Sequence, residues 1–291
     1  MSRKRRRGPG RAGQALAAAC AALFAYGAFV YLTLPDVREL KVRNPDTTAF
    51  IELRAREARA RGEEPKRTQR WVSYGRISSN LTRAVLVAED DRFWKHDGID
   101  FDELKESMEV NIERMEFARG GSTITQQLAK NLYLSPSKNP IRKVRELLIA
   151  RELEAELSKQ RILELYLNVV EWGEGIYGAE AAARAYFHKS AADLAPQDAA
   201  LLAAALVNPR LLDPAHPTAR LKRRQQMVMR RMGAVTPPPV LAGPIPEPPA
   251  LPSPEPVPAL RIDAAPDMLP GEAVPATSEV PKPPAGPPDR P

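Results

Sequence analysis

Apolar positions in the middle of the chain recur every three or four residues, which is typical of helices that bury one face. Asn80 is a favourable N-cap for LTRAVLVAEDDRFW, Ser122 or Thr123 for a helix through Leu134, and Ser158 for KQRILELYLN. Two further buried helices are predicted by GAEAAARAYF and APQDAALLAAALV. Because no stretch alternates long enough to require a sheet, the pattern predicts a mainly α fold.

The start of the chain has a different pattern. Six of the first eleven residues are Lys or Arg, and the 22 positions from Gly13 to Leu34 carry no charge. At about 1.5 Å per helical residue, this run covers roughly 33 Å, enough for a hydrocarbon core of about 30 Å. We expect a basic cytoplasmic stub at 1–12 and a transmembrane helix at 13–34, with the remainder extracytoplasmic. The alternatives are a cleaved signal peptide, whose apolar run is usually shorter, and a nuclear-type basic stretch.

The rest of the chain divides by composition. Residues 35–70 are rich in charge, as in ELRAREARARGEEPKR, and predict a juxtamembrane linker with a short solvated helix. The main domain is expected at 71–233. Residues 234–291 hold 20 of the 30 prolines and predict a disordered or polyproline II tail.

The net charge of +7 is distributed unevenly along the chain. Without the six positive charges of the first eleven residues and the net −4 of the tail, residues 12–233 carry +5. A mildly basic domain beyond a membrane span suits a membrane surface or an anionic substrate, and it argues against a nucleic-acid partner. The one cysteine, Cys20, lies in the apolar run, so no disulfide within the chain is expected.

Helical register selects one acid from the stretch AEDDRFWKHDGID. It places Glu89 on a face with Val85, Leu86 and Phe93, whereas the two following aspartates turn away. Apolar neighbours raise the pKa of a carboxyl group towards the range of a general base. A capping or salt-bridged glutamate is the alternative.

The same stretch also has the composition of a metal cluster. The chain holds three histidines, and His96 lacks a second histidine at ligand spacing. A transition-metal site is therefore not expected. Asp91, Asp97 and Asp100 are expected to be solvated or to form turns.

A second stretch, GGSTITQQLAKN, combines two glycines with a helix start, whose free N–H groups favour anions. Thr123, Gln126, Gln127 and Lys130 follow on one polar face. The alternative is a capping box, Thr123 with Gln126, on an ordinary amphipathic helix.

A third stretch, IRKVRELLIARELEAEL, places Arg142 and Glu146 four residues apart. Glu146 continues into an apolar stripe through Ile149 and Leu153, so a second carboxylate is expected among apolar residues. An ordinary intrahelical ion pair is the alternative reading.

Together, EDDRFWKHDG, GGSTITQQLAKN, RKVRE, KQRILELYLN and GEGIYGAEAAARAYFHKS resemble the successive motifs of the peptidoglycan glycosyltransferases of glycosyltransferase family 51. The resemblance covers about residues 44–233. It implies a lysozyme-like, mainly helical catalytic domain with a membrane-associated jaw subdomain. It also implies that lipid II is polymerised into β-1,4-linked glycan with inversion at C1 and release of undecaprenyl pyrophosphate, at the inner membrane.

The resemblance carries roles to individual residues. Glu89 matches the general base and Glu146 the second essential glutamate, while Lys130 and Arg142 match cations that bind the pyrophosphate. Positions that line the cleft are matched by Ser122, Thr123, Gln126, Gln127 and Asn131. The remaining positions of the first motif, with structural or supportive roles, are Asp90, Phe93 and His96. The resemblance weakens after Ala205, so Arg210 and Arg224 receive no substrate contact.

No obligatory cofactor is implied, and stimulation by Mg²⁺ or Mn²⁺ stays open. The expected partners are lipid II, the nascent glycan strand and the membrane. Proteins of cell-wall synthesis or division and a partner of the tail stay open.

Three other functions compete with this interpretation. A muramidase or lytic transglycosylase would share the fold and the glutamate but leaves Lys130 and Arg142 unexplained. For a penicillin-binding protein, Ser135 to Lys138 fits S-x-x-K and Ser78 to Asn80 fits S-x-N, but in the wrong order and without K-T-G. A noncatalytic scaffold that uses its tail is the non-enzyme alternative.

Overall fold

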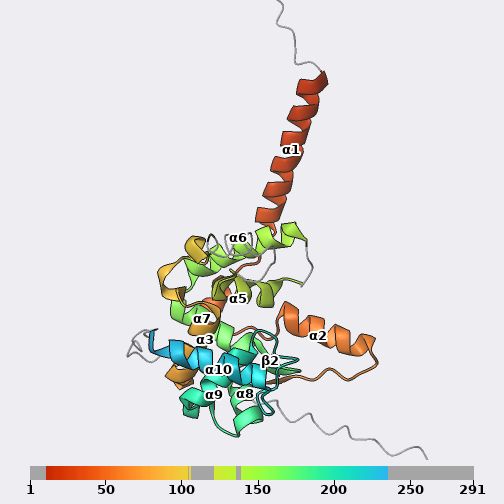
Figure 1. Ribbon diagram of the computed structural model, residues 1–291. Coiled ribbons are helices and arrows are strands. Elements are labelled where there is room, and N and C mark those ends of the chain that lie inside the picture. The colour runs from red at the N-terminus through yellow and green to blue at the C-terminus, as the bar shows by residue number, and fades with distance from the viewer. Residues whose placement is uncertain (1–10, 104, 106–120, 136–138, 235–291) are drawn as a thin grey trace, which may run out of the picture. The chain divides into compact units, whose positions relative to one another are not determined.

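The computed structural model describes residues 11–103, 105, 121–135 and 139–234. These residues are mainly helical, as the apolar pattern predicts (Figure 1). The α-helices are α1 (Arg11–Leu32), α2 (Ala49–Ala60), α3 (Ser79–Glu89), α5 (Ile124–Tyr133), α6 (Pro140–Glu156), α7 (Lys159–Val169), α8 (Ala179–Phe187), α9 (Pro196–Ala205) and α10 (Ala219–Arg231). Short 3-10 helices are η1 (Arg38–Lys41), η2 (Tyr74–Arg76), η3 (Phe93–Lys95), η4 (Ala191–Asp193) and η5 (Met232–Ala234).

A small sheet accompanies the helices. Its strands are β1 (Thr68–Gln69), β2 (Glu171–Gly173) and β3 (Ile176–Tyr177), in the order β1-β3-β2. β1 is parallel to β3, and β2 is antiparallel to it. The sequence pattern does not predict this sheet, because strands of two or three residues are too short for alternation to be recognised.

Local capping chemistry explains where several helices begin. The side chains of Thr123 and Ser158 accept backbone hydrogen bonds at the starts of α5 and α7, as predicted. The prediction of Asn80 as the N-cap of α3 is wrong by two residues, because Ser78 accepts from the Asn80 N–H instead. α3 also ends earlier than expected, at Glu89.

The core is built from two sets of packed helices that share one hydrophobic cluster. α3 packs against α9 and α10, and α5 packs against α6 and α7. Large buried side chains of this cluster include Leu81, Leu86, Leu128, Ile162, Leu163 and Leu202. Val37 and Leu40 also belong to it, so part of the predicted linker at 35–70 contributes to the core. This packing fixes α3, α5 and α6 relative to one another, and these helices carry the candidate site.

α1 covers most of the segment at 13–34. Within the described part of the chain, no helix has the length and apolar character needed to cross a membrane. All described residues fall in one compact unit, Met1–Pro248, whereas the second unit, Pro249–Pro291, lies outside them. The predicted tail at 234–291 is likewise outside the described residues except for Ala234.

Candidate active site

The first element of the site is Glu89 at the end of α3. Its neighbours Val85 and Leu86 are buried, as the helical register predicts, but Phe93 lies in η3 and not in the same helix. Gln127 Nε2 donates a hydrogen bond of 2.8 Å to Glu89 Oε2. Burial raises the pKa of Glu89, whereas this hydrogen bond and the charges of Arg224 and Lys130 oppose the rise. A partly buried carboxylate with a raised pKa is suited to accept a proton.

The second element is Glu146 in α6, which is buried with 3% of its surface exposed. Arg142 donates to Glu146 Oε2 at 2.7 Å, so the intrahelical ion pair predicted by the spacing is present. Lys143 Nζ donates to the other oxygen at 2.5 Å. Both oxygens of Glu146 are therefore held by cations.

Lys143 is a further residue of the candidate site, and the motifs in the sequence do not single it out. Besides Glu146, its ammonium donates to Ser122 Oγ at 3.2 Å and to Gln126 Oε1 at 2.9 Å. Three acceptors match the three protons of an ammonium group. Lys143 thus ties the start of α5 to α6. The spacing of Lys143 and Glu146 in RKVRE, three residues apart on a helix, is the signal that could have revealed it.

Lys130, on α5, interacts electrostatically with both glutamates. Burial lowers the pKa of Lys130. The negative charges of Glu146 and Glu89 raise this pKa, whereas the positive charges of Arg142 and Lys143 lower it further. Among the described residues, the Lys130 ammonium makes no hydrogen bond or ion pair. An ammonium group without such a partner is suited to bind an anionic group.

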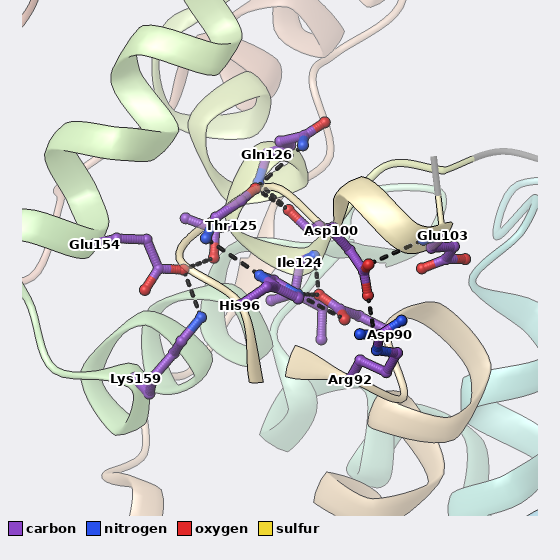
Figure 2. Close-up of polar contacts among 12 residues, drawn as sticks. Asp90, Arg92, His96, Asp100, Glu103, Ile124, Thr125, Gln126, Glu154 and Lys159 are labelled. Atoms are coloured by element: carbon purple, nitrogen blue, oxygen red, sulfur yellow. Dashed lines mark hydrogen bonds and ion pairs between the residues drawn. The ribbon is translucent and has the colours of Figure 1, made fainter. Parts of the chain in front are cut away.

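Asp90 organises the turn that follows Glu89 (Figure 2). The Asp90 carboxylate is buried, accepts the Ile124 N–H at 2.9 Å at the start of α5, and lies 3.0 Å from His96 Nε2. His96 Nδ1 accepts the Gly98 N–H at 3.2 Å, so the ring proton is on Nε2 and points to Asp90. Both ring nitrogens of His96 are therefore engaged within the protein.

Gly98 closes the same turn against α5. Its φ of +82° is in the region that favours glycine, and an added Cβ would lie 3.3 Å from the carbonyl oxygen of Ala150. The Gly98 carbonyl oxygen accepts from the Thr123 hydroxyl at 2.7 Å and from Gln126 Nε2 at 3.1 Å. Gln126 therefore does not complete the capping box considered from the sequence, although Thr123 does cap α5.

The remaining predicted site residues divide into two groups. Ser122, Gln126 and Gln127 lie with the acids and cations through the contacts above. Phe93 is fully buried beneath the Lys159 ammonium, and Asn131 donates to the Gln127 carbonyl oxygen at 2.9 Å. The structure thus turns Phe93, Asn131 and His96 inward.

The three remaining acids of AEDDRFWKHDGID, expected to be solvated or to form turns, differ in exposure. Asp91 is exposed and pairs with Arg231 at 2.5 Å, and Asp97 is exposed. Asp100 is buried and accepts the Glu103 N–H at 2.9 Å. Across residues 11–103, 105, 121–135 and 139–234, no group of three or more His, Cys, Asp or Glu side chains is arranged to hold a metal ion.

Comparison with known proteins places this chain in a family. The family described as Transglycosylase matches residues 56–233, more than half of the chain. A biosynthetic peptidoglycan transglycosylase of Herminiimonas arsenicoxydans is 47% identical over 191 residues, covering 66% of this chain and 83% of the relative. A protein of the same name from Aromatoleum aromaticum is 53% identical over 167 residues, covering 57% of this chain and 73% of the relative. The chain belongs to the transglycosylase family.

Proposed function

We propose that this chain is a peptidoglycan glycosyltransferase that polymerises lipid II into β-1,4-linked glycan strands during cell-wall synthesis. Family membership and the names of the relatives support the reaction class. The observation that carries the proposal is the separation of roles between two acids. Among the residues that the structure describes, no cation lies in hydrogen-bond contact with Glu89, whose pKa is raised, whereas Glu146 is paired with Arg142 and Lys143.

In the proposed reaction, Glu89 is the general base. Its carboxylate accepts the proton of the 4-hydroxyl group of the acceptor sugar as that oxygen forms a bond to C1 of the donor sugar. A raised pKa makes Glu89 a stronger base while the group still ionises. Attack from the face opposite the leaving group inverts C1, so an α-linked donor yields a β-linked product.

The cations around Glu146 act on the leaving group. The bond from C1 to the pyrophosphate oxygen breaks, and undecaprenyl pyrophosphate departs as an anion that needs charge stabilisation more than protonation. Lys130 has no hydrogen-bonding partner among the described residues and is suited to meet this anion. Arg142, aligned by Glu146, supplies a guanidinium that can bind phosphate oxygens in a bidentate manner. In this proposal Glu146 anchors Arg142 and Lys143, which bind its two oxygens.

The direct test is polymerisation of labelled lipid II by the purified full-length protein. We expect glycan strands to form and undecaprenyl pyrophosphate to be released. Incubation of preformed polymer without lipid II tests the rival muramidase function, because fragments would be released only by a cleaving enzyme. Absence of polymer together with fragment release would overturn the proposal.

We propose that α1 attaches the enzyme to the inner membrane, with the catalytic domain on the extracytoplasmic side. Large apolar side chains of α1 are exposed, among them Leu23, Phe24 and Leu32. Fractionation of cells that express the whole chain, with and without residues 1–34, measures this contribution. An unchanged membrane fraction after the deletion would remove α1 from the anchoring role.

A membrane-associated jaw is proposed next to this anchor. Ile141 and Val144, near the start of α6, are exposed apolar residues. Arg145, beside them in the chain, donates to the Thr33 hydroxyl at 2.9 Å, directly after α1. Replacing Ile141 and Val144 with Ser is expected to weaken binding to liposomes of bacterial lipid. Equal binding by the variant and the parent protein would contradict the jaw.

The dependence of activity on metal ions can be measured in the lipid II polymerisation assay. We expect polymerisation to persist in a chelator, since Lys130 and Arg142 supply positive charge without a metal. Addition of Mg²⁺ or Mn²⁺ after the chelator then measures any stimulation of the rate.

We expect that the purified protein is not labelled by penicillin. Of the S-x-x-K motif, Ser135 is described, whereas Pro136, Ser137 and Lys138 lie outside the described residues.

A further inference from the structure

Behind Glu89 lies a chain of hydrogen bonds that crosses three helices. Tyr166 of α7 is completely buried, and its hydroxyl donates to Gln127 Oε1 of α5 at 3.0 Å. The amide nitrogen of the same Gln127 donates to Glu89 Oε2 of α3 at 2.8 Å. The sequence motifs do not single out Tyr166, which lies among the apolar residues of the predicted helix KQRILELYLN.

The chemistry of the three groups allows one orientation of the amide. An ionised carboxylate only accepts hydrogen bonds, so the NH₂ of Gln127 must face Glu89 and its carbonyl oxygen must face Tyr166. That oxygen in turn requires a donor. The Tyr166 hydroxyl remains a donor across the physiological pH range, because burial raises the pKa of Tyr166 well above its ordinary value.

We propose that Tyr166 is a positioning residue that holds the Gln127 amide with its NH₂ towards Glu89. This inference rests on the proposed role of Glu89 as general base. The hydrogen bond from Gln127 occupies Oε2, while Glu89 Oε1 makes no hydrogen bond with the described residues. Oε1 is therefore the oxygen left to receive the proton of the acceptor hydroxyl.

Removal of the Tyr166 hydroxyl has a predictable electrostatic result. Without its donor, the Gln127 amide can rotate and present its carbonyl oxygen to Glu89, which favours the protonated carboxyl group. The other charged groups that act on Glu89 are Lys130 of α5, Arg224 of α10 and the adjacent Asp90. None of these is altered by a substitution at Tyr166, so a shift in the titration of Glu89 would report on the amide.

The experiment compares Tyr166→Phe with Tyr186→Phe in the full-length protein. Tyr186 also donates one hydrogen bond, to the Trp172 carbonyl oxygen at 3.2 Å, and serves as the matched control. For Tyr166→Phe we expect kcat near neutral pH to fall about 3- to 10-fold, in line with one lost hydrogen bond, with little change in KM. The acidic limb of the pH–rate profile should move to higher pH. Tyr186→Phe should retain the parent profile.

A readout that does not require activity separates this inference from the proposed function. The carboxyl carbon of Glu89, labelled with ¹³C and assigned by its absence in Glu89→Gln, can be titrated by NMR. Tyr166→Phe should titrate at higher pH than the parent protein. Failure of the parent protein to polymerise lipid II would refute the proposed function, but it would leave this titration interpretable.

Two further variants test the path through the amide. In a Gln127→Ala background, Tyr166→Phe should produce no additional shift, because the hydroxyl would act through an absent group. If Tyr166→Phe does not fold, Gln127→Met, which lacks the donor, should by itself raise the pH at which Glu89 titrates. An unshifted Glu89 in Tyr166→Phe or Gln127→Met, an equal shift in Tyr186→Phe, or an additive shift in the double variant would overturn the proposal.

Discussion

Glu89 and Glu146 have similar sequence contexts but different surroundings in the folded chain. Each is a carboxylate on a helix with apolar neighbours, and each lies near basic residues. Within the described part of the chain, Glu89 receives one hydrogen bond, from the neutral amide of Gln127, whereas Arg142 and Lys143 bind the two oxygens of Glu146. Helical pattern alone therefore does not determine what a carboxylate can do.

The difference follows from which charges are brought within contact distance. Burial desolvates Glu89 and raises its pKa, and none of the described cations pairs with it directly. Glu146 is buried as part of an ion-paired cluster, and it fixes the cations in return. Two acids with divergent environments are a recurring arrangement in enzymes that need one proton acceptor and one electrostatic anchor.

Glu89→Gln is expected to have the largest effect. A general base typically contributes about 10²- to 10⁴-fold, so polymerisation of labelled lipid II should fall by that factor. The amide fills the same space and can still accept from Gln127, so lipid II binding should persist. Binding to immobilised lipid II is the control. Activity close to that of the parent protein would remove Glu89 from the base role.

Glu146→Gln should reduce activity by about 10²-fold through a different route, because the cations lose their anchor. It should also destabilise the fold. Removing one partner of a buried ion pair costs on the order of 3 kcal/mol, which Glu89→Gln should not show. Chemical denaturation of the two variants at neutral pH measures the contrast. Equal free energies of unfolding would show that the two acids are held alike.

Lys143→Met tests the contact that joins α5 to α6. The substitution removes the donor to Ser122, Gln126 and Glu146 but leaves Arg142 on the second Glu146 oxygen. We expect about a 10-fold loss of activity, smaller than that of Glu146→Gln, because one cation still orients the carboxylate. Lys189→Met, which removes an exposed ion pair with Asp198, is the matched control and should be neutral. A neutral Lys143→Met would contradict the proposed link.

Much of the fold could be predicted from the sequence because capping residues and apolar spacing act locally. Thr123 and Ser158 cap the helices where expected. The end of α3 could not be predicted, since it depends on a distant contact. Asp90 leaves the helical conformation, with φ −167° and ψ 81°, and accepts a hydrogen bond from Ile124 at the start of α5.

The composition of the candidate site was predictable only in part. Glu89, Glu146, Lys130 and Arg142 follow from residue type, spacing and family resemblance. The contacts of Lys143 with Ser122 and of Tyr166 with Gln127 join residues 21 and 39 positions apart, and no local rule gives such pairs. The same limit applies to His96: the resemblance gives it a structural or supportive role, and its contacts with Asp90 and Gly98 are visible only in the folded chain.

The smallest expected effect is a pH dependence that separates Glu89 from an ordinary surface carboxylate. Because burial raises the pKa of Glu89 above its usual 4.5, the folded chain binds this proton more tightly than the unfolded chain. The stability that Glu89 contributes is therefore fully present below pH 4.5 and is lost as the pH rises through the folded-state pKa. Glutamine does not titrate, so the free energy of unfolding of the parent protein minus that of Glu89→Gln should fall across this window, by about 1.4 kcal/mol per unit of pKa difference.

Denaturant titrations from pH 4 to 8 measure this difference, and Glu63→Gln provides a control of opposite sign. The hydrogen bond from Arg61 lowers the pKa of Glu63, so the contribution of Glu63 is present above its unfolded-state pKa and is lost as the pH falls through the folded-state value. Its exposed ion pair should make that change small. A flat difference for Glu89→Gln, or one that rises with pH as for Glu63→Gln, would mean that Glu89 is held as an ion-paired acid and that its environment does not differ in kind from that of Glu146.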